Sequence, residues 1–141
     1  MNQHRNFDWS TVGLDFGNWD EDKIWNLDLP VTIMNIAELE WLFDIPFWTN
    51  DRGERWALTP RDVIEAVEGS TREAERMQKA DTAYPIDIFE SKGRWLVLDG
   101  LHRLAKEYKL GKREVNVRTV PAERLEEIKS EYPMELPLRD E

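Results

Sequence analysis

The pattern of apolar and polar residues between positions 95 and 120 predicts a strand, a tight turn, a helix and a second strand, in that order. Residues 95–98, WLVL, form a short apolar run suited to a buried strand. Asp99-Gly100 interrupts the run, and the apolar residues then recur with a helical period. The predicted buried face of this helix carries Leu101, Leu104, Ala105 and Tyr108. Gly111 follows the last apolar position, where helices commonly end, and a valine-rich strand over 115–120 comes next.

The same periodicities predict the elements on either side of this stretch. A strand over 29–34 contains Pro30, which places it at a sheet edge. The remaining elements are a helix over 36–43, helices over 59–68 and 70–80, a strand over 84–89 and a helix over 121–129. Ser70 and Glu73 form a capping-box pattern. The strand over 84–89 should pair with the 95–98 strand as an antiparallel hairpin.

We predict one domain with a segment on either side of it. A chain of 141 residues is long enough to bury a core. Residues 1–28 are rich in aromatic residues without sustained periodicity and are predicted to be an irregular arm, residues 29–130 form the domain, and residues 131–141 form a C-terminal tail. We expect the aromatic residues of the arm to pack onto the domain surface. The alternative is an arm that closes over a pocket or a partner.

Charge and composition narrow the possible functions. The net charge is −10, which argues against nucleic acid as a ligand, because DNA-binding proteins usually present a basic face. The chain has no cysteine, which excludes disulfides and thiolate chemistry. No apolar run is long enough to span a membrane. The N-terminal residues MNQHRNFDWS lack the apolar segment of a signal peptide, so the expected location is cytoplasmic.

The candidate chemistry lies where the 95–98 strand gives way to the following helix. Backbone N–H groups are unpaired in the first turn of a helix, and the helix dipole favours anions there. His102 and Arg103 add side-chain donors, and Gly100 allows a ligand to approach the backbone closely. These features predict a cradle for an anion. The alternative is structural: His102 would cap or pack, and Arg103 would pair with Glu107 one turn along the helix.

The run Asp99-Gly100-Leu101-His102-Arg103, followed by Leu104-Ala105 and a Leu110-Gly111 stop, resembles the D-G-x-H-R signature of the ParB/sulfiredoxin superfamily. This group includes ParB domains, sulfiredoxins and free-serine kinases. The resemblance covers residues 84–127 well and the preceding region loosely. It implies a compact α+β domain with a small mixed sheet and packed helices. It also implies ATP or another nucleoside triphosphate and Mg²⁺ as ligands, with phosphate contacts from Gly100, Leu101, His102 and Arg103.

Two acidic residues are candidates for catalysis. A carboxylate at the end of a strand, such as Asp99, could hold Mg²⁺ or accept a proton from an attacking hydroxyl, and it could equally cap the following helix. The resemblance to the serine-kinase branch implies a catalytic role for Asp99 and a second acid soon after the first strand. Glu38, Glu40 and Asp44 occupy that region. Asp44 is the preferred residue because it lies where the 36–43 helix gives way to a loop.

The chain differs from members of the superfamily in two features, and each difference argues against one of their activities. Sulfiredoxins carry a nucleophilic cysteine directly before His-Arg, and this chain has Leu101 there, so sulfinic-acid reduction is excluded. ParB partition proteins carry a helical DNA-binding domain after this module. Residues beyond 130 are too few to form one, so centromere binding is not expected.

Other residues offer weaker candidate sites. Trp48 and Trp56 with Arg52 and Arg55 could line a base-stacking pocket, although core aromatics and surface charges are the commoner roles. The sequence contains two histidines, and a histidine metal site is therefore not expected.

The leading hypothesis is a nucleotide-binding domain, with a small-molecule kinase or a nucleotide hydrolase as its possible activities. The alternative is a non-catalytic protein-interaction or regulatory module that keeps the signature turn for structural reasons, and DNA binding is a third option. The surroundings of Asp99, His102 and Arg103 distinguish the first two hypotheses. An open pocket where these side chains converge favours nucleotide binding, whereas pairing of all three within the protein favours the module.

Overall fold

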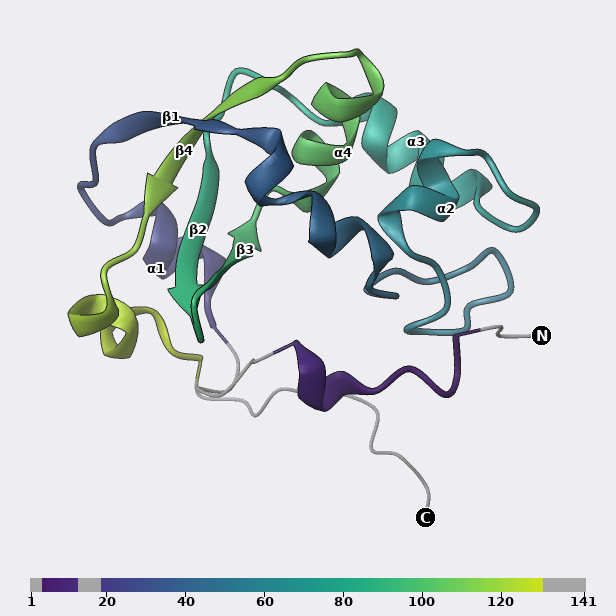
Figure 1. The fold of residues 1–141 in the computed structure, drawn as a ribbon, viewed down its shortest axis with the longest axis horizontal. Coiled ribbons are helices and arrows are strands. Elements are labelled where there is room, and N and C mark those ends of the chain that lie inside the picture. Colours follow the sequence, from purple (N-terminus) through teal and green to yellow (C-terminus); the bar gives the residue numbers. More distant parts are fainter. Residues whose placement is uncertain (1–3, 13–18, 131–141) are drawn as a thin grey trace.

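The computed structural model describes residues 4–12 and 19–130, and a four-stranded mixed sheet forms its centre (Figure 1). The strands are β1 (Val31–Asn35), β2 (Ile86–Ser91), β3 (Arg94–Asp99) and β4 (Glu114–Thr119). Their order in the sheet is β1-β4-β2-β3. The pairs β1–β4 and β2–β3 are antiparallel, whereas β2 and β4 run parallel. The predicted α+β class with a small mixed sheet is confirmed.

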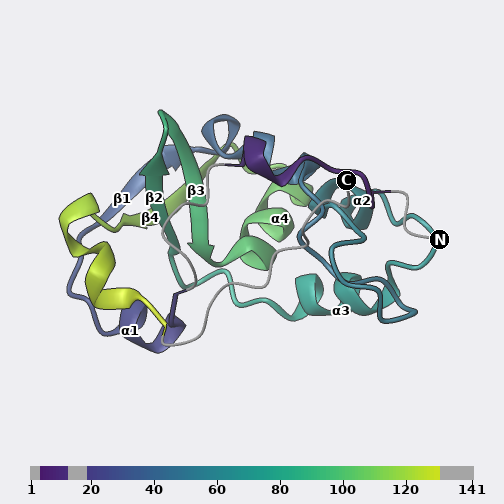
Figure 2. The ribbon, with the colours of Figure 1, turned by 90° about the horizontal axis from the view of Figure 1, so that it is seen from below.

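Helices cover the sheet and extend the domain to one side. The α-helices are α1 (Glu21–Trp25), α2 (Pro60–Ile64), α3 (Thr71–Lys79) and α4 (Leu101–Lys109). The 3-10 helices are η1 (Trp9–Thr11), η2 (Ile36–Glu38), η3 (Glu40–Asp44) and η4 (Ala122–Ile128). Figures 1 and 2 show α4 between the sheet and the pair formed by α2 and α3. Within the described ranges, no helix has the length and apolar character needed to cross a membrane.

The hairpin that leads into the signature forms as predicted. β2 and β3 are joined through Lys92 and Gly93, which both have positive φ angles, of 53° and 79°. Two left-handed residues give the backbone twist that suits the right-handed twist of the flanking strands. β3 therefore runs antiparallel to β2 and delivers the chain directly to Gly100 at the start of α4.

Two segments predicted as α-helices are 3-10 helices in the structure. The predicted 36–43 helix consists of η2 and η3, and the predicted 121–129 helix is η4. Apolar residues three positions apart explain the difference, because positions i and i+3 lie on one side of a 3-10 helix. Ile36, Leu39 and Leu42 have this spacing and are buried. The spacing was compatible with either helix type.

The helices α2 and α3 are capped in different ways. Thr59 and Asp62 form a reciprocal capping box at the start of α2. The capping-box prediction at Ser70 is wrong, because its hydroxyl donates to the carbonyl oxygen of Val67 instead. The Asp51 carboxylate caps α3 from a distant loop, accepting hydrogen bonds from the two backbone N–H groups at 71 and 72 over 3.1 and 2.9 Å. These bonds lower the pKa of Asp51.

The predicted irregular arm contains helical structure and contributes to the core. Its described part includes η1 and α1, and it buries Val12, Ile24 and Leu27 against the domain. The aromatic rings of Phe7, Trp9 and Trp19 pack against this core, as expected. The predicted tail, 131–141, lies outside the described residues.

A row of charged residues crosses three adjacent strands beneath α1. Asp99 on β3 is the pairing partner of Asp87 on β2, and Asp87 is in turn the partner of Arg118 on β4. Arg118 Nε donates to Asp87 Oδ1 over 2.7 Å, and its two terminal nitrogens donate to the carbonyl oxygens of Ile24 and Leu27. Burial raises the pKa of Asp87, and the charge of Asp99 adds to this effect while Arg118 opposes it. Arg118 therefore joins α1 to the sheet and compensates a buried carboxylate.

We expect Arg118→Ala to lower the free energy of unfolding by about 3–5 kcal/mol, because it leaves Asp87 buried without its cation. Denaturant unfolding followed by circular dichroism measures the change. Arg124→Ala is the matched control: it removes an arginine whose pair with Glu127 lies at the surface, and the unfolding midpoint should stay in place. Equal effects of the two substitutions would contradict the role given to Arg118.

Candidate functional site

The signature residues lie where β3 ends and α4 begins. Gly100 is the N-cap of α4 and has a φ of 105°, a left-handed conformation that residues with a side chain rarely adopt. No side chain caps α4, so the alternative role of Asp99 as its N-cap is wrong. Because α4 begins at Leu101, the N–H groups of its first turn have no partner within the helix. This turn supplies the predicted arrangement of backbone donors.

Asp99 is held by two side chains that both contact its Oδ2 atom. The indole Nε1 of Trp25 donates over 2.7 Å, and Nη2 of Arg103 donates over 3.2 Å. Arg103 also donates to the carbonyl oxygen of Pro85 over 3.1 Å. The predicted alternative, a pair between Arg103 and Glu107, is therefore wrong. Asp99 instead links α1, β3 and α4.

His102 is fixed by a ring contact and a carboxylate. Its imidazole stacks on Trp48 with 4.2 Å between ring centroids and 12° between planes, and Nε2 lies 3.1 Å from Oε1 of Glu73. Glu73 also accepts from Arg76 and from the backbone N–H of Thr49. Burial favours the neutral form of Glu73, but the hydrogen bond and charge of His102 hold its pKa below the ordinary value. His102 thus joins α4 to α3 through a buried carboxylate.

A pocket of about 450 Å³ lies beside the first turn of α4, and we call it the α4 pocket. Four signature residues line it, namely Asp99, Gly100, Leu101 and His102. Aromatic residues form much of the remaining wall, and these are Trp19, Phe47, Trp48 and Trp56. The volume falls within the range of small-molecule sites. The residues of the first turn of α4 and several aromatic residues therefore line the same space.

Charged residues of both signs border the α4 pocket. Arg76 reaches it from α3 with a side chain that is 64% exposed. Glu21 lines it from α1. Partial burial raises the pKa of Glu21, and the charge of Asp99 adds to this effect while Arg103 opposes it. The pocket thus combines one exposed cation with two carboxylates that repel each other.

Arg103 does not line the α4 pocket. It faces a separate pocket of about 630 Å³, which we call the Arg103 pocket. This second pocket is lined by Trp25, Asp81, Tyr84, Pro85, Asp87, Arg103 and Arg118. The four residues predicted to bind phosphate are therefore divided: Gly100, Leu101 and His102 lie on one side of the turn, and Arg103 lies on the other.

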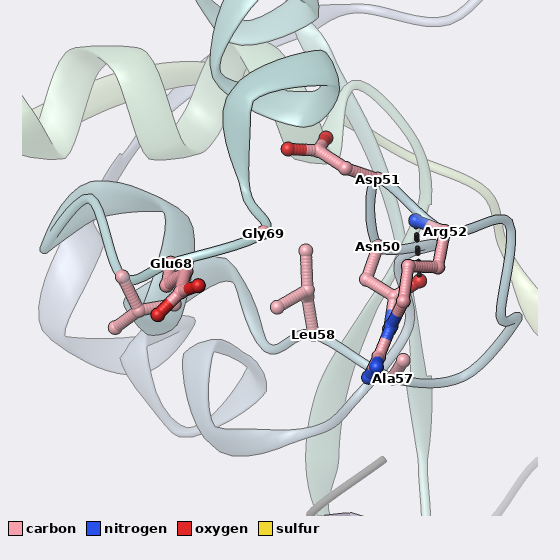
Figure 3. Close-up of a pocket in the computed structure, with 8 residues that line it drawn as sticks. Asn50, Asp51, Arg52, Ala57, Leu58, Glu68 and Gly69 are labelled. Atoms are coloured by element: carbon pink, nitrogen blue, oxygen red, sulfur yellow. Dashed lines mark hydrogen bonds between the residues drawn. The ribbon is translucent and has the colours of Figure 1, made fainter. Parts of the chain in front are cut away.

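A third pocket, of about 550 Å³, lies between the 50–58 loop and residues 67–69 (Figure 3). Of the candidate residues named from the sequence, Arg52 lines it, and none of the signature residues does. Its polar groups have structural partners: Asp51 caps α3, and Asn50 Oδ1 accepts from the backbone N–H groups of Arg52 and Glu54. Arg52 pairs with Glu54 over 3.0 Å. These contacts explain the polar residues of this loop without a ligand.

The structure does not bring Asp44 to Asp99. Asp44 ends η3 and pairs with Arg61 of α2 over 2.8 Å, and its side chain is exposed. It lines neither the α4 pocket nor the Arg103 pocket, and the same holds for Glu38 and Glu40. In residues 4–12 and 19–130, no three histidine or acidic side chains gather in a way that could hold a metal ion.

Several residues of the site were not predicted from the sequence. Trp19 and Glu21 lie in the segment expected to be an irregular arm, and Trp25 ends the short helix within it. Glu73 was predicted as the capping-box partner of Ser70, and it instead contacts His102. Trp48 and Trp56 were considered as base-stacking residues, and both line the α4 pocket. Arg52 and Arg55 do not line it.

The surroundings of Asp99, His102 and Arg103 agree in part with nucleotide binding and in part with a structural turn. Asp99, His102 and Arg103 each have partners within the protein, which was the expectation for a structural turn. Asp99 and His102 nevertheless border an open pocket together with the first turn of α4. The arrangement offers backbone donors and aromatic surfaces to a ligand, whereas the side chains are largely engaged in holding the turn.

We expect Gly100→Ala to destabilise the protein more than Gly93→Ala. Both glycines have positive φ, so each substitution adds strain of about 1–2 kcal/mol. A Cβ at position 100 would lie 2.7 Å from Nη2 of Arg103, whereas nothing lies within 4 Å of one at position 93. The bonds of Arg103 to Asp99 and Pro85 would have to change. Urea unfolding should show an additional loss of about 1 kcal/mol for Gly100→Ala, and equal losses would argue against a tight Arg103 contact.

Comparison with known proteins adds no relative to this description. No family model, curated protein or solved structure matches the chain.

Proposed function

We propose that this domain binds a nucleotide in the α4 pocket, with the phosphates at the first turn of α4 and the base against the tryptophan rings. One observation carries the proposal: backbone donors at a helix N-terminus and several indole rings border a single pocket of about 450 Å³. A phosphate ester with an aromatic base is the common ligand that needs both features. The D-G-x-H-R resemblance to the ParB/sulfiredoxin superfamily points to the same ligand class.

The phosphate end of the ligand would lie at residues 100–102. The N–H groups of the first turn of α4 have no intrahelical acceptors, and the helix dipole adds partial positive charge there. The missing side chain of Gly100 makes room for Arg103 and not for the ligand, because the guanidinium occupies that space. Arg76 can turn toward the phosphates, since its side chain is exposed and its partner Glu73 retains His102 and the N–H of Thr49. Arg103 is not required in this arrangement.

The base would lie against the aromatic wall. His102 already stacks on Trp48, and we assign the base to the rings of Trp19 and Trp56. The Trp56 ring also contacts Trp9 edge-on and lies under Arg55, which a base would have to displace or share. Stacking of a base on an aromatic side chain contributes about 1–3 kcal/mol. Stacking accepts any base, so this wall supports nucleotide binding without selecting ATP over CTP or GTP.

The two carboxylates of the pocket fit a divalent cation carried by the nucleotide. Mg²⁺ is usually held by one or two carboxylates together with phosphate oxygens. Asp99 and Glu21 are the residues that would hold it. Burial is the main cause of the raised pKa of Glu21, and the charge of Asp99, which a cation would offset, adds to it. Mg²⁺ would supply charge neutralisation beside the phosphates. ATP with Mg²⁺ is therefore the first ligand to test.

The contacts of the acidic residues favour binding over phosphoryl transfer. Asp99, the predicted base, already accepts two hydrogen bonds, and Asp44 lies elsewhere in η3. Both hydrogen bonds fall on Oδ2, so Oδ1 is the atom of Asp99 that would contact a cation or a hydroxyl. A non-catalytic protein-interaction or regulatory module is the second candidate, and the internal pairing of Asp99, His102 and Arg103 favours it.

Calorimetric titration of ATP, ADP, CTP and GTP in the presence of Mg²⁺ tests the proposal. Saturable binding to the wild type is expected, with lower affinity when EDTA removes the cation. Arg76→Gln should weaken binding about three- to tenfold, because it removes an exposed cation beside the phosphates. His102→Ala should also weaken binding, because it removes a ring from the pocket wall.

Arg72→Gln is the matched control for Arg76→Gln. It makes the same charge change on α3, but Arg72 does not line the pocket, so affinity should remain that of the wild type. Equal weakening by both substitutions would indicate a general charge effect. Absence of binding for all four nucleotides would reject the proposal and favour the protein-interaction module.

A further inference from the structure

We propose that the Arg103 pocket is a second binding site, specific for a small molecule that carries an aromatic ring and a single carboxylate. The pocket has a volume of about 630 Å³, within the range of ligand sites. Its lining combines two arginines with two large aromatic side chains, Trp25 and Tyr84. It is separate from the α4 pocket, and the inference does not depend on nucleotide binding.

Arg103 has hydrogen-bonding capacity that the protein does not use. A guanidinium has five N–H donors, and the bonds of Arg103 to Asp99 and Pro85 both come from Nη2. In the described part of the chain, the N–H donors on Nε and Nη1 have no acceptor, and Nε is fully buried. Nε is out of reach of both water and a ligand, whereas Nη1 lies on the accessible part of the side chain, which is 17% exposed overall. A ligand with a carboxylate at Nη1 would supply the missing acceptor.

The aromatic residues of this pocket are unusually exposed. Trp25 is 55% exposed and Tyr84 is 63% exposed. Trp25 is held by its indole bond to Asp99, so its ring is presented in a fixed orientation. Tyr84 precedes β2, next to Pro85, whose carbonyl oxygen Arg103 holds. These rings offer apolar faces on which an aromatic ligand can stack.

The other charges of the pocket limit the negative charge that a ligand can carry, since Arg103 is itself paired with Asp99 at 3.2 Å. Arg118 is paired with Asp87 at 2.7 Å, so the two form a neutral floor. Asp81 adds a carboxylate to the lining, and it accepts a hydrogen bond from the N–H of Ala83. A polyphosphate would meet both carboxylates and would be repelled. A monocarboxylate can reach Arg103 with little such repulsion.

Indole-3-acetate and phenylacetate are suitable probes, with indole-3-acetamide and cyclohexylacetate as their controls. Binding is followed by the indole N–H signals of the uniformly ¹⁵N-labelled full chain, and the Trp25 signal is assigned from Trp25→Phe. The Trp25 signal should shift on titration, while those of Trp19 and Trp48 in the α4 pocket should not. The amide should bind about tenfold more weakly than the acid, because it cannot form a charge-assisted hydrogen bond with Arg103.

Two substitutions at Tyr84 test the aromatic wall. The side chain of Tyr84 is exposed, so replacing it leaves the core packing unchanged. Tyr84→Ala should weaken binding about three- to tenfold, whereas Tyr84→Phe keeps the ring and should bind as the wild type does. Equal affinity for the acid and the amide would overturn the anion assignment. The pocket assignment would be overturned by binding unaffected by Tyr84→Ala, or by Mg²⁺-ATP competing with the probe. Such competition would make this pocket the nucleotide site and leave nucleotide binding itself intact.

Discussion

Four charged side chains, Arg103, Asp99, Asp87 and Arg118, form a line across one end of the sheet, and much of the structure depends on their balance. The two carboxylates are partners on neighbouring strands, where like charges repel each other. Each is compensated by one arginine, and these arginines also donate to carbonyl oxygens of Pro85, Ile24 and Leu27. The line thereby joins α1, α4 and three strands. Removing either cation would leave a partly or fully buried carboxylate uncompensated.

This balance also determines which groups are available to a ligand. Asp99 faces the α4 pocket but uses Oδ2 to hold Trp25 and Arg103, which face the other pocket. The α4 pocket is left with backbone donors, tryptophan rings and one exposed cation, Arg76. Such a set can bind and orient an anion, and Glu21 adds a carboxylate to the lining. The Arg103 pocket receives the guanidinium with unused donors. The signature turn therefore separates two pockets of different chemistry.

The sequence predicted the features that depend on local patterns. The β2–β3 hairpin, α4, its end near Gly111 and the edge position of β1 follow from periodicity, glycine and proline. Contacts between distant segments could not be predicted in this way. The N-terminus of α3 is capped by Asp51 from a distant loop and not by the adjacent Ser70. Glu73 is buried where it contacts His102, which lies 29 positions further along the chain. The direction of Arg103 likewise depends on tertiary neighbours that adjacent residues do not specify.

A backbone NMR titration with Mg²⁺-ATP shows whether a nucleotide binds at the first turn of α4. Amide signals of Leu101 and His102 should shift progressively and saturate, together with the indole signals of Trp19 and Trp56, because these groups border the α4 pocket. The amide signal of Gly93, at the far end of β3, should stay in place and serves as the internal reference. Saturable binding with no shift at residues 100–102 would contradict the account.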